Sequence, residues 1–189
     1  MKRIKKHTFV ALSLFFASVK LLSAADYFVS NEGSDVAEGS ASQPWRTMSH
    51  AVSQAVPGDT VYVHGGTYSE RVIFPRSGTP GKYIVFKTVA GEQPVIDGRQ
   101  LIISGRQGLF QLIDKSYLRI EGFTLRDYQS SSQNAVPVGI LIEGGGDGLE
   151  IVGNTIESIA SNATVNEELS GRNAHGIAVY GNAITAVTD

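Results

Sequence analysis

The chain has 189 residues, a formal net charge of −2 and no cysteine. This length suits one domain, and the near-neutral charge argues against a nucleic-acid partner, which usually needs a basic stripe. Without disulfides, burial of apolar side chains must hold the fold together. Twenty-one glycines separate short apolar runs, a pattern typical of all-β proteins.

Residues 1–25 have the features of a secretory signal peptide. Four basic residues among the first six precede an apolar run over residues 8–19, and Ser23-Ala24-Ala25 offers small residues to signal peptidase. A membrane anchor is the alternative, but such a run reaches only about 18 Å as a helix, against a bilayer core of about 30 Å. We therefore expect cleavage after Ala25, export to the periplasm, cell surface or medium, and no membrane span in the mature chain.

Residues 26–81 are expected to form an N-terminal cap and a first coil. Short strands are predicted at 27–30, 61–63 and 72–74, with a turn at 77–81. The predicted helix has Pro44 in its first turn and ends at Pro57-Gly58. Its apolar residues recur at helical spacing on one face, namely Trp45, Met48, Val52 and Ala55.

From residue 82 to 189 the chain repeats. The segment Leu-Arg-Ile-Glu-Gly-Phe-Thr-Leu from Leu118 returns 31 residues later, from Leu149, as Leu-Glu-Ile-Val-Gly-Asn-Thr-Ile. Ile84 and Phe86 begin the preceding copy, whose second half is Val95-Ile96. A further short strand recurs at 110–112, 140–142 and 177–179.

Strands this short fit a coil of three that pairs in parallel with the next coil about 4.8 Å away. Leu118, Ile120 and Leu125 would then point inward, while Gly122 and Gly153 supply tight turns. No coil buries its apolar face alone, so the fold requires a stack, with the amphipathic helix covering its first coil. We predict an all-β parallel β-helix, and a β-sandwich is the alternative.

The last residues do not offer a comparable cover for the other end of the stack. Residues 184–186 begin another strand, and the chain stops inside that coil at Asp189. An uncovered end would expose apolar side chains and unpaired strand edges. We therefore expect these 189 residues to be the N-terminal part of a longer protein.

Two stretches resemble the N-terminal signature of the pectate-lyase-like right-handed β-helix superfamily: Pro57-Gly58-Asp59-Thr60-Val61-Tyr62-Val63, and Gly66-Thr67-Tyr68-Ser69-Glu70. Pro44-Trp45-Arg46-Thr47 and the turn Gly153-Asn154-Thr155-Ile156 fit the same pattern. The resemblance extends from Tyr27 to the end of the chain and implies a right-handed solenoid. That superfamily includes polysaccharide lyases, glycoside hydrolases, uronate epimerases, adhesins and phage tailspikes, so the fold leaves the activity open.

The resemblance also implies a chemistry. Lyases of this superfamily typically hold calcium with aspartates and use a lysine or arginine as base; the metal neutralises the uronate carboxylate and favours β-elimination. Calcium is therefore a candidate cofactor, although no such acidic cluster is visible here. The repeat places Asp97, Arg126 and Glu157 in one column, which we interpret as an exposed ion-pair ladder worth under about 1 kcal/mol per pair. Asp59 is interpreted as a turn residue and Glu70 as a cap or turn contact.

Candidate substrate-binding residues gather near the connections between the second and third strands of each coil. These connections, at 127–138 and 158–175, leave from one edge of the stack, and loops on rigid scaffolds often carry function. Tyr128 could stack on a sugar ring, and Arg172 could pair with a uronate, with Arg126 nearby. His175 adds an imidazole, which titrates near neutral pH. Connections that merely tolerate insertions are the alternative.

These observations favour an exported polysaccharide-active protein that cleaves an acidic, uronate-containing polysaccharide by β-elimination. We expect its catalytic residues, unknown from this sequence, to lie on later coils, and the complete protein to be a monomer. Its partner would be a polysaccharide or a cell-surface glycan. The alternative is a non-catalytic β-helix that binds glycans or serves as an adhesin.

Overall fold

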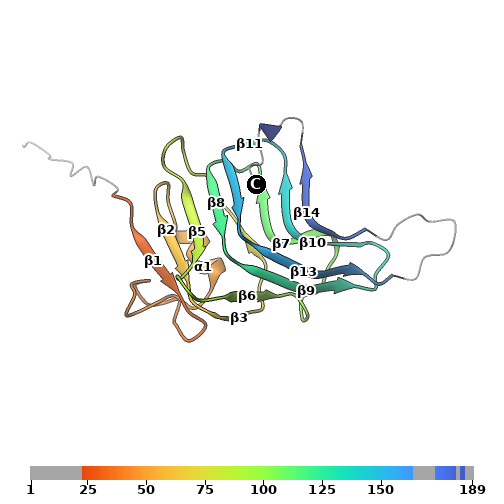
Figure 1. Ribbon diagram of the computed structural model, residues 1–189, viewed down its shortest axis with the longest axis horizontal. Coiled ribbons are helices and arrows are strands. Elements are labelled where there is room, and N and C mark those ends of the chain that lie inside the picture. The colour runs from red at the N-terminus through yellow and green to blue at the C-terminus, as the bar shows by residue number, and fades with distance from the viewer. Residues whose placement is uncertain (1–22, 164–172, 182–183, 186–189) are drawn as a thin grey trace, which may run out of the picture.

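A computed structural model describes residues 23–163, 173–181 and 184–185. In this part of the chain the backbone winds through three parallel sheets, coil after coil (Figure 1). The first sheet contains β1 (Asp26–Val29), β2 (Thr60–Val63), β5 (Ile84–Thr88), β8 (Leu118–Glu121) and β12 (Leu149–Val152). The second contains β3 (Gly66–Tyr68), β6 (Pro94–Asp97), β9 (Thr124–Ser130) and β13 (Thr155–Ser161). The third contains β4 (Val72–Ile73), β7 (Gly105–Ile113), β10 (Ala135–Glu143) and β14 (His175–Tyr180).

The pairing register confirms the predicted repeat and the parallel β-helix. Ile84, Leu118 and Leu149 lie in one column of the first sheet. In the third sheet, Phe110 pairs with Ile140 in the same way. A short parallel pair, β11 (Gly146–Asp147) with β15 (Ile184–Thr185), lies beside the stack and confirms the strand predicted to begin at residue 184. Each coil therefore hydrogen-bonds to the next, as the short strands require.

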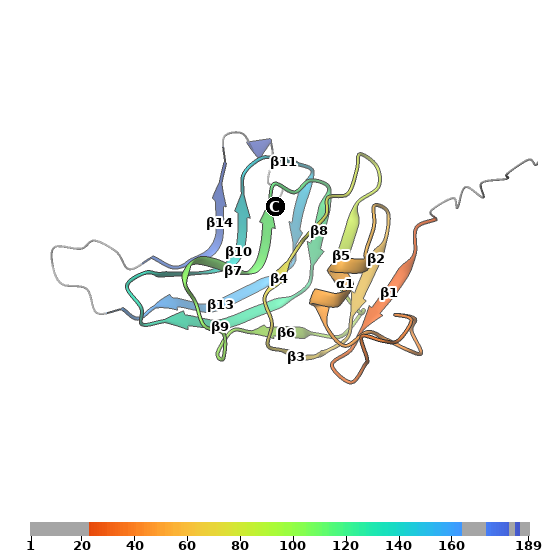
Figure 2. The ribbon, with the colours of Figure 1, turned by 180° about the vertical axis from the view of Figure 1, so that it is seen from behind.

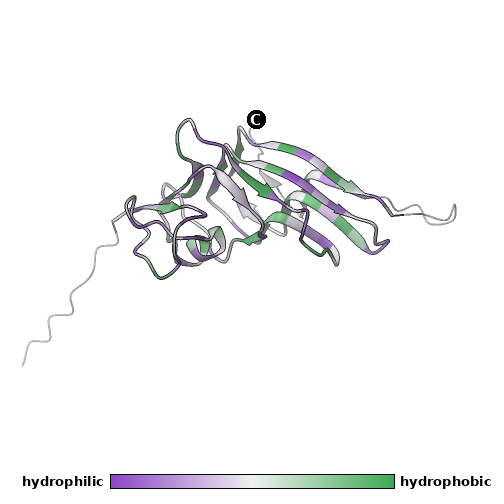
Figure 3. Ribbon diagram, turned by 90° about the horizontal axis from the view of Figure 1, so that it is seen from below, coloured by the Kyte–Doolittle hydropathy of each residue, from purple (hydrophilic) through white to green (hydrophobic). Residues whose placement is uncertain are grey.

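The core runs through the middle of the stack. Leu118, Ile120 and Leu125 are completely buried, as predicted. Ile151 and Ile156 of the last described coil are half-buried and pack on the core from one side. Hydropathy alternates along the strands (Figure 3), because successive side chains point to opposite sides of a sheet.

The predicted turn glycines adopt the backbone conformation expected of them. Gly122 has φ +86° and Gly153 has φ +59°, in the region that other residues adopt only with strain. A Cβ at Gly122 would also lie 2.9 Å from Thr88 Cγ2 of the preceding coil. The turn between the first and second sheets therefore requires glycine both for its conformation and for its close packing.

The helix α1 (Met48–Gln54) covers the N-terminal end of the stack, which is seen from behind in Figure 2. Met48, Ala51 and Val52 are buried, and so is Trp45 just before the helix. This confirms the predicted cap. Among the described residues, no helix is long and apolar enough to cross a membrane.

The helix begins later than predicted, because Pro44 and Trp45 belong to an extended segment. The Trp45 N–H donates to the Phe28 carbonyl, and the Ser30 N–H donates to the Trp45 carbonyl, both at 2.9 Å. These bonds to the neighbouring strand fix residue 45 outside the helix. Thr47 is the N-cap, and its hydroxyl accepts the His50 N–H at 3.1 Å.

The connection from the second to the third sheet is shorter than the predicted loop over residues 127–138. Strand β9 continues to Ser130 and β10 begins at Ala135, so only residues 131–134 are irregular. In Figure 1, β9, β13 and the first part of β10 extend together away from the stack. A projecting edge of paired strands therefore takes the place of the predicted loop. The next connection includes residues 164–172, which lie outside the described residues.

Candidate functional site

The outer side of the third sheet carries a cluster of charged and aromatic side chains. Strands β7 and β10 curve along their length (Figures 1 and 2), which brings the start of β7 toward the end of β10. The Arg106 guanidinium near the start of β7 lies 2.6 Å from Glu143 Oε1 at the end of β10. It also lies over the Tyr180 ring, 3.8 Å from its centre. We call Arg106, Glu143, His175 and Tyr180 the Arg106 cluster.

His175 and Tyr180 form a close pair within the Arg106 cluster. The Tyr180 hydroxyl lies 3.3 Å from His175 Nε2, and the two rings meet edge to face. Tyr180 is 37 % exposed, so it is accessible from solvent. The contact with Tyr180 and the charge of Glu143 outweigh burial and raise the pKa of Arg106. Two groups able to exchange a proton therefore lie beside a permanent cation.

A small apolar cluster supports this side of the sheet. Leu141 and Ala178 lie two residues before Glu143 and Tyr180, and thus on the same side of the sheet. With Val138 they form a buried cluster separate from the main core. The strands that carry the Arg106 cluster therefore have buried apolar residues on both sides, which restricts their movement.

Arg126 lies on a different surface, the outer side of the second sheet. The register confirms the predicted column, since Arg126 pairs with Asp97 of β6 and with Glu157 of β13. The predicted ion pair between Arg126 and Asp97 is present, but the prediction that it is exposed is wrong for Asp97, whose side chain is only 8 % exposed. The ion pairs of Arg126 run to Asp97 and Asp127, each with 3.5 Å between Nε and a carboxylate oxygen.

The predicted stacking of Tyr128 on a sugar ring is also wrong. The side chain is completely buried in the core, and this burial raises the pKa of its hydroxyl. Asp127 just before it has φ +53°, which interrupts the alternation of the strand and turns the next side chain inward. Among the predicted site residues, His175 lies in the Arg106 cluster, whereas Arg172 lies outside the described residues.

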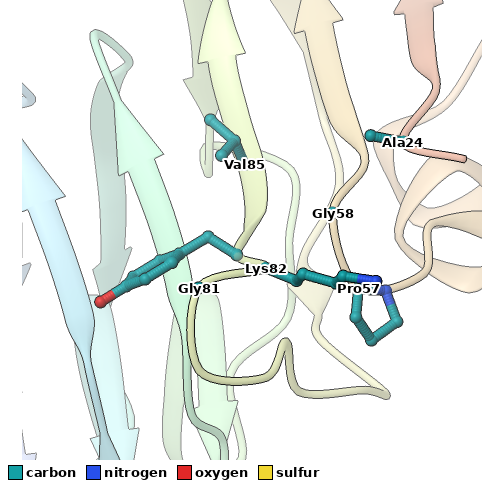
Figure 4. Close-up of a pocket in the computed structure, with 7 residues that line it drawn as sticks. Ala24, Pro57, Gly58, Gly81, Lys82 and Val85 are labelled. Atoms are coloured by element: carbon teal, nitrogen blue, oxygen red, sulfur yellow. The ribbon is translucent and has the colours of Figure 1, made fainter.

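A pocket of about 330 Å³ opens at the start of the first sheet (Figure 4). Its lining is mostly apolar and consists of Ala24, Pro57, Gly58, Gly81, Lys82, Tyr83 and Val85. Ala24 belongs to the predicted signal peptide, so a chain cleaved after Ala25 would lack one wall of this pocket. The pocket is therefore a weaker candidate than the Arg106 cluster.

Residues 27–186 match the family described as Pel9A-like, right-handed β-helix region. The chain belongs to this family. The right-handed coils and the membership of the pectate-lyase-like superfamily, both expected from the signature around Pro57 and Gly66, are thereby confirmed.

The chain is similar in sequence to a bacterial and a fungal protein. The uncharacterized protein YwoF of Bacillus subtilis (strain 168) is 38% identical over 155 residues, which cover 81% of this chain and 32% of YwoF. Pectate lyase PEL9 of Emericella nidulans is 38% identical over 90 residues, which cover 47% of this chain and 22% of PEL9. The chain thus matches less than a third of the length of either relative.

Solved structures with a similar fold include two carbohydrate-active enzymes. The GH136 lacto-N-biosidase of Eubacterium ramulus aligns with a TM-score of 0.64 at 13% identity, over 83% of this chain and 30% of that one. A rhamnogalacturonan lyase aligns with a TM-score of 0.55 at 18% identity, over 84% of this chain and 50% of that one. At such low identities the likeness concerns the fold alone.

The described residues do not fit the calcium ion implied by the family resemblance. In residues 23–163 and 173–181, no group of three or more His, Cys, Asp or Glu side chains is placed to hold a metal ion. Asp97 and Asp127 both bind Arg99. The positive charge of Arg99, with that of Arg126 beside it, would repel a cation from these two carboxylates.

The sequence did not single out three members of the Arg106 cluster. Glu143 and Tyr180 occupy the same register position in adjacent coils of the third sheet, so the repeat alignment could have paired them. Arg106 could not have been found in this way, because it pairs in register with Val136 rather than with Glu143. Only the curvature of β7 and β10 brings its guanidinium to the end of the sheet.

Proposed function

We propose that this member of the Pel9A-like family is exported and cleaves an acidic polysaccharide by β-elimination on the outer side of its third sheet. The observation that carries the proposal is the Arg106 cluster, in which a cation, a phenol and an imidazole are in contact on an accessible surface. The acidic substrate is inferred from the relative PEL9, whose name is pectate lyase. Export is inferred from the leader at residues 1–25.

The reaction assigns a role to each side chain. A base removes the C5 proton of the uronate, the bond from C4 to the glycosidic oxygen breaks, and a C4–C5 double bond forms. Arg106 would pair with the uronate carboxylate and stabilise the negative charge that develops as the proton leaves. Glu143 holds this guanidinium in place at 2.6 Å.

His175 and Tyr180 would carry the protons. One of the two accepts the C5 proton, and the other donates a proton to the departing oxygen, which is general acid–base catalysis. The distance of 3.3 Å between the Tyr180 hydroxyl and His175 Nε2 permits the proton to return between turnovers. The elimination then needs no water and no oxidant.

The test uses the full-length protein and polygalacturonate, with and without added calcium, and follows the ultraviolet absorbance of the unsaturated product. Tyr180→Phe and His175→Ala are each expected to lower kcat by about 100-fold or more, the usual share of general acid–base catalysis. Arg119→Ala is the control. Arg119 lies in the first sheet and pairs with Glu121 and Glu150, so its variant should keep the wild-type rate.

Two outcomes would contradict the proposal. Unchanged kcat in both Tyr180→Phe and His175→Ala would exclude the Arg106 cluster as the catalytic site. Saturable binding of uronate polymers without any unsaturated product, with calcium present, would replace the lyase by the non-catalytic glycan-binding alternative.

A further inference from the structure

A second pocket, with a polar lining, lies on the outer side of the second sheet, on a different surface from the Arg106 cluster. It encloses about 450 Å³. Every residue that lines it is polar or charged: Thr67, Ser69, Asp97, Arg99, Gln100 and Arg126. These residues come from β3, β6 and β9 and from the segments just after β3 and β6, so three successive coils build the pocket. We call it the Arg126 pocket.

Two carboxylates hold Arg99 of the Arg126 pocket in place. Arg99 Nη2 lies 2.8 Å from Asp97 Oδ2 and 3.1 Å from Asp127 Oδ2. Asp97 also accepts the backbone N–H of Arg99 at 3.0 Å. The Asp97 side chain is only 8 % exposed, whereas the Arg99 side chain is 64 % exposed. A buried carboxylate thus holds a guanidinium that faces solvent.

Arg126 is incompletely paired in the described structure. Its Nε is buried and has no hydrogen-bond partner among the described residues. The two nearest carboxylate oxygens both lie at 3.5 Å from Nε, which is long for a charged hydrogen bond. A guanidinium has five N–H donors, and a buried donor without an acceptor is costly. Nε itself is covered, but the Arg126 side chain as a whole is 35 % exposed, so a ligand in the pocket can offer an acceptor to the rest of the guanidinium.

We propose that the Arg126 pocket is a non-catalytic binding site for a carboxylate-bearing sugar residue. Asp97 and Asp127 balance the charges of Arg99 and Arg126, so the assignment rests on the shape of the guanidinium, which pairs with a carboxylate through two parallel hydrogen bonds. The hydroxyls of Thr67 and Ser69 and the amide of Gln100 can bind sugar hydroxyls. The enclosed volume lies within the range of about 300–1,000 Å³ that is common for small-ligand sites.

This assignment rests on the proposed function for the class of its ligand, since an enzyme of acidic polysaccharides meets many such residues along one chain. The Arg126 pocket would hold the polymer on the second sheet while the Arg106 cluster acts on the third. A polymer engaged at two sites gains effective concentration at the second, provided that it spans both. The pocket should therefore matter for long polymers and little for short oligomers.

The experiment measures binding and cleavage separately in the full-length protein. Binding of polygalacturonate is followed by calorimetry with the Tyr180→Phe variant, and cleavage of a short oligomer is followed by product absorbance with the otherwise wild-type chain. Arg126→Ala should weaken polymer binding by about tenfold or more, the effect of losing one charged hydrogen bond. Arg119→Ala is the matched control, because both arginine side chains are 35 % exposed.

A second pair of variants protects the test against misfolding. If Arg126→Ala loses the circular-dichroism spectrum of the folded protein, the Gln100→Ala and Thr67→Val variants test the pocket instead. Both residues are exposed, so their replacement should leave the fold intact. Each should weaken polymer binding by at least threefold. Fully methyl-esterified polymer, which lacks the carboxylates, should bind equally to Arg126→Ala and to the parent protein.

The outcomes separate this inference from the proposed function. Unchanged polymer affinity in the folded pocket variants would overturn the Arg126 pocket, even if the protein is a lyase. Weaker binding in these variants, with no cleavage by the wild type, would support the pocket and refute the elimination. Equal losses of affinity for charged and esterified polymers in Arg126→Ala would overturn the assignment of a carboxylate ligand.

Discussion

The side chains that follow the kink in β9 differ from what alternation along a strand predicts. Leu125 points into the core and Arg126 points out, so strict alternation would bring Tyr128 to the surface. Asp127 adopts φ +53° instead, and Ser158, at the equivalent place in the next coil, adopts φ +54°. The left-handed backbone at this residue shifts the alternation by one position, so the next side chain points inward instead of outward. Tyr128 is therefore a core residue, although it stands next to the Arg126 pocket in the sequence.

Tyr128 offers a direct test of this placement. Its hydroxyl is near Arg71 Nη1, but at 3.5 Å the contact is weak. Tyr128→Phe should therefore change the free energy of unfolding by less than about 1 kcal/mol, whereas Tyr128→Ala should lower it by about 3–5 kcal/mol. Chemical denaturation measures both. A Phe variant of normal stability that no longer binds acidic polymers would instead restore a surface role to this ring.

At the scale of single elements, the short helix α1 depends on residues far away in the sequence. Glu70 accepts the backbone N–H groups of Met48 and Ser49, both at 2.9 Å, as well as the Ser49 hydroxyl. Asp35 accepts the Thr47 N–H at 2.9 Å and the Thr47 hydroxyl at 2.8 Å. The predicted role of Glu70 as a cap contact is thus confirmed. A carboxylate at this end also suits the positive end of the helix dipole.

Glu70→Ala should lower the free energy of unfolding by about 1 kcal/mol, the usual effect of losing an N-terminal cap. Glu70→Gln should retain part of the stability, because its amide oxygen can still accept one N–H. Glu32→Ala serves as the control, since Glu32 is exposed in the loop after β1. Thermal unfolding of the three variants measures the effect. Equal melting temperatures for Glu70→Ala and Glu32→Ala would contradict the capping role.

At the scale of the whole molecule, the stability of each coil should depend mainly on its contacts with the coils directly beside it. The packing between coils is close at Gly139 of β10. A Cβ there would lie 2.5 Å from the Gly176 carbonyl oxygen and 2.7 Å from Ile156 Cγ2. Gly145 has open space around it. The chain has one tryptophan, Trp45, which lies at the opposite end of the stack and therefore reports on the cap.

Gly139→Ala should destabilise the last described coils by about 1–3 kcal/mol, as other overpacked sites do, whereas Gly145→Ala should have little effect. Because the damage is local, loss of strand signal by circular dichroism should precede the change in Trp45 fluorescence during denaturation. Coincident transitions in the Gly139→Ala variant would show instead that the described coils and the cap unfold as one unit.

The sequence by itself determined the stack of coils. Within each coil, the identity and spacing of inward residues such as Leu118 and Ile120 specify the register, because a shift of one residue would turn every apolar side chain to the surface. Local patterns also identified the cap helix and its Glu70 contact. These features depend on short stretches that repeat or that match a family signature.

Only the tertiary structure decided which surface residues meet. Arg106 reaches Glu143 because β7 and β10 curve, and Asp97 is buried because Arg99 and Arg126 cover it. Tyr128 turns inward because of one backbone angle at the preceding residue. Each of these outcomes depends on strand curvature or on contacts between coils, which arise when the chain packs and leave no pattern in a single stretch of sequence.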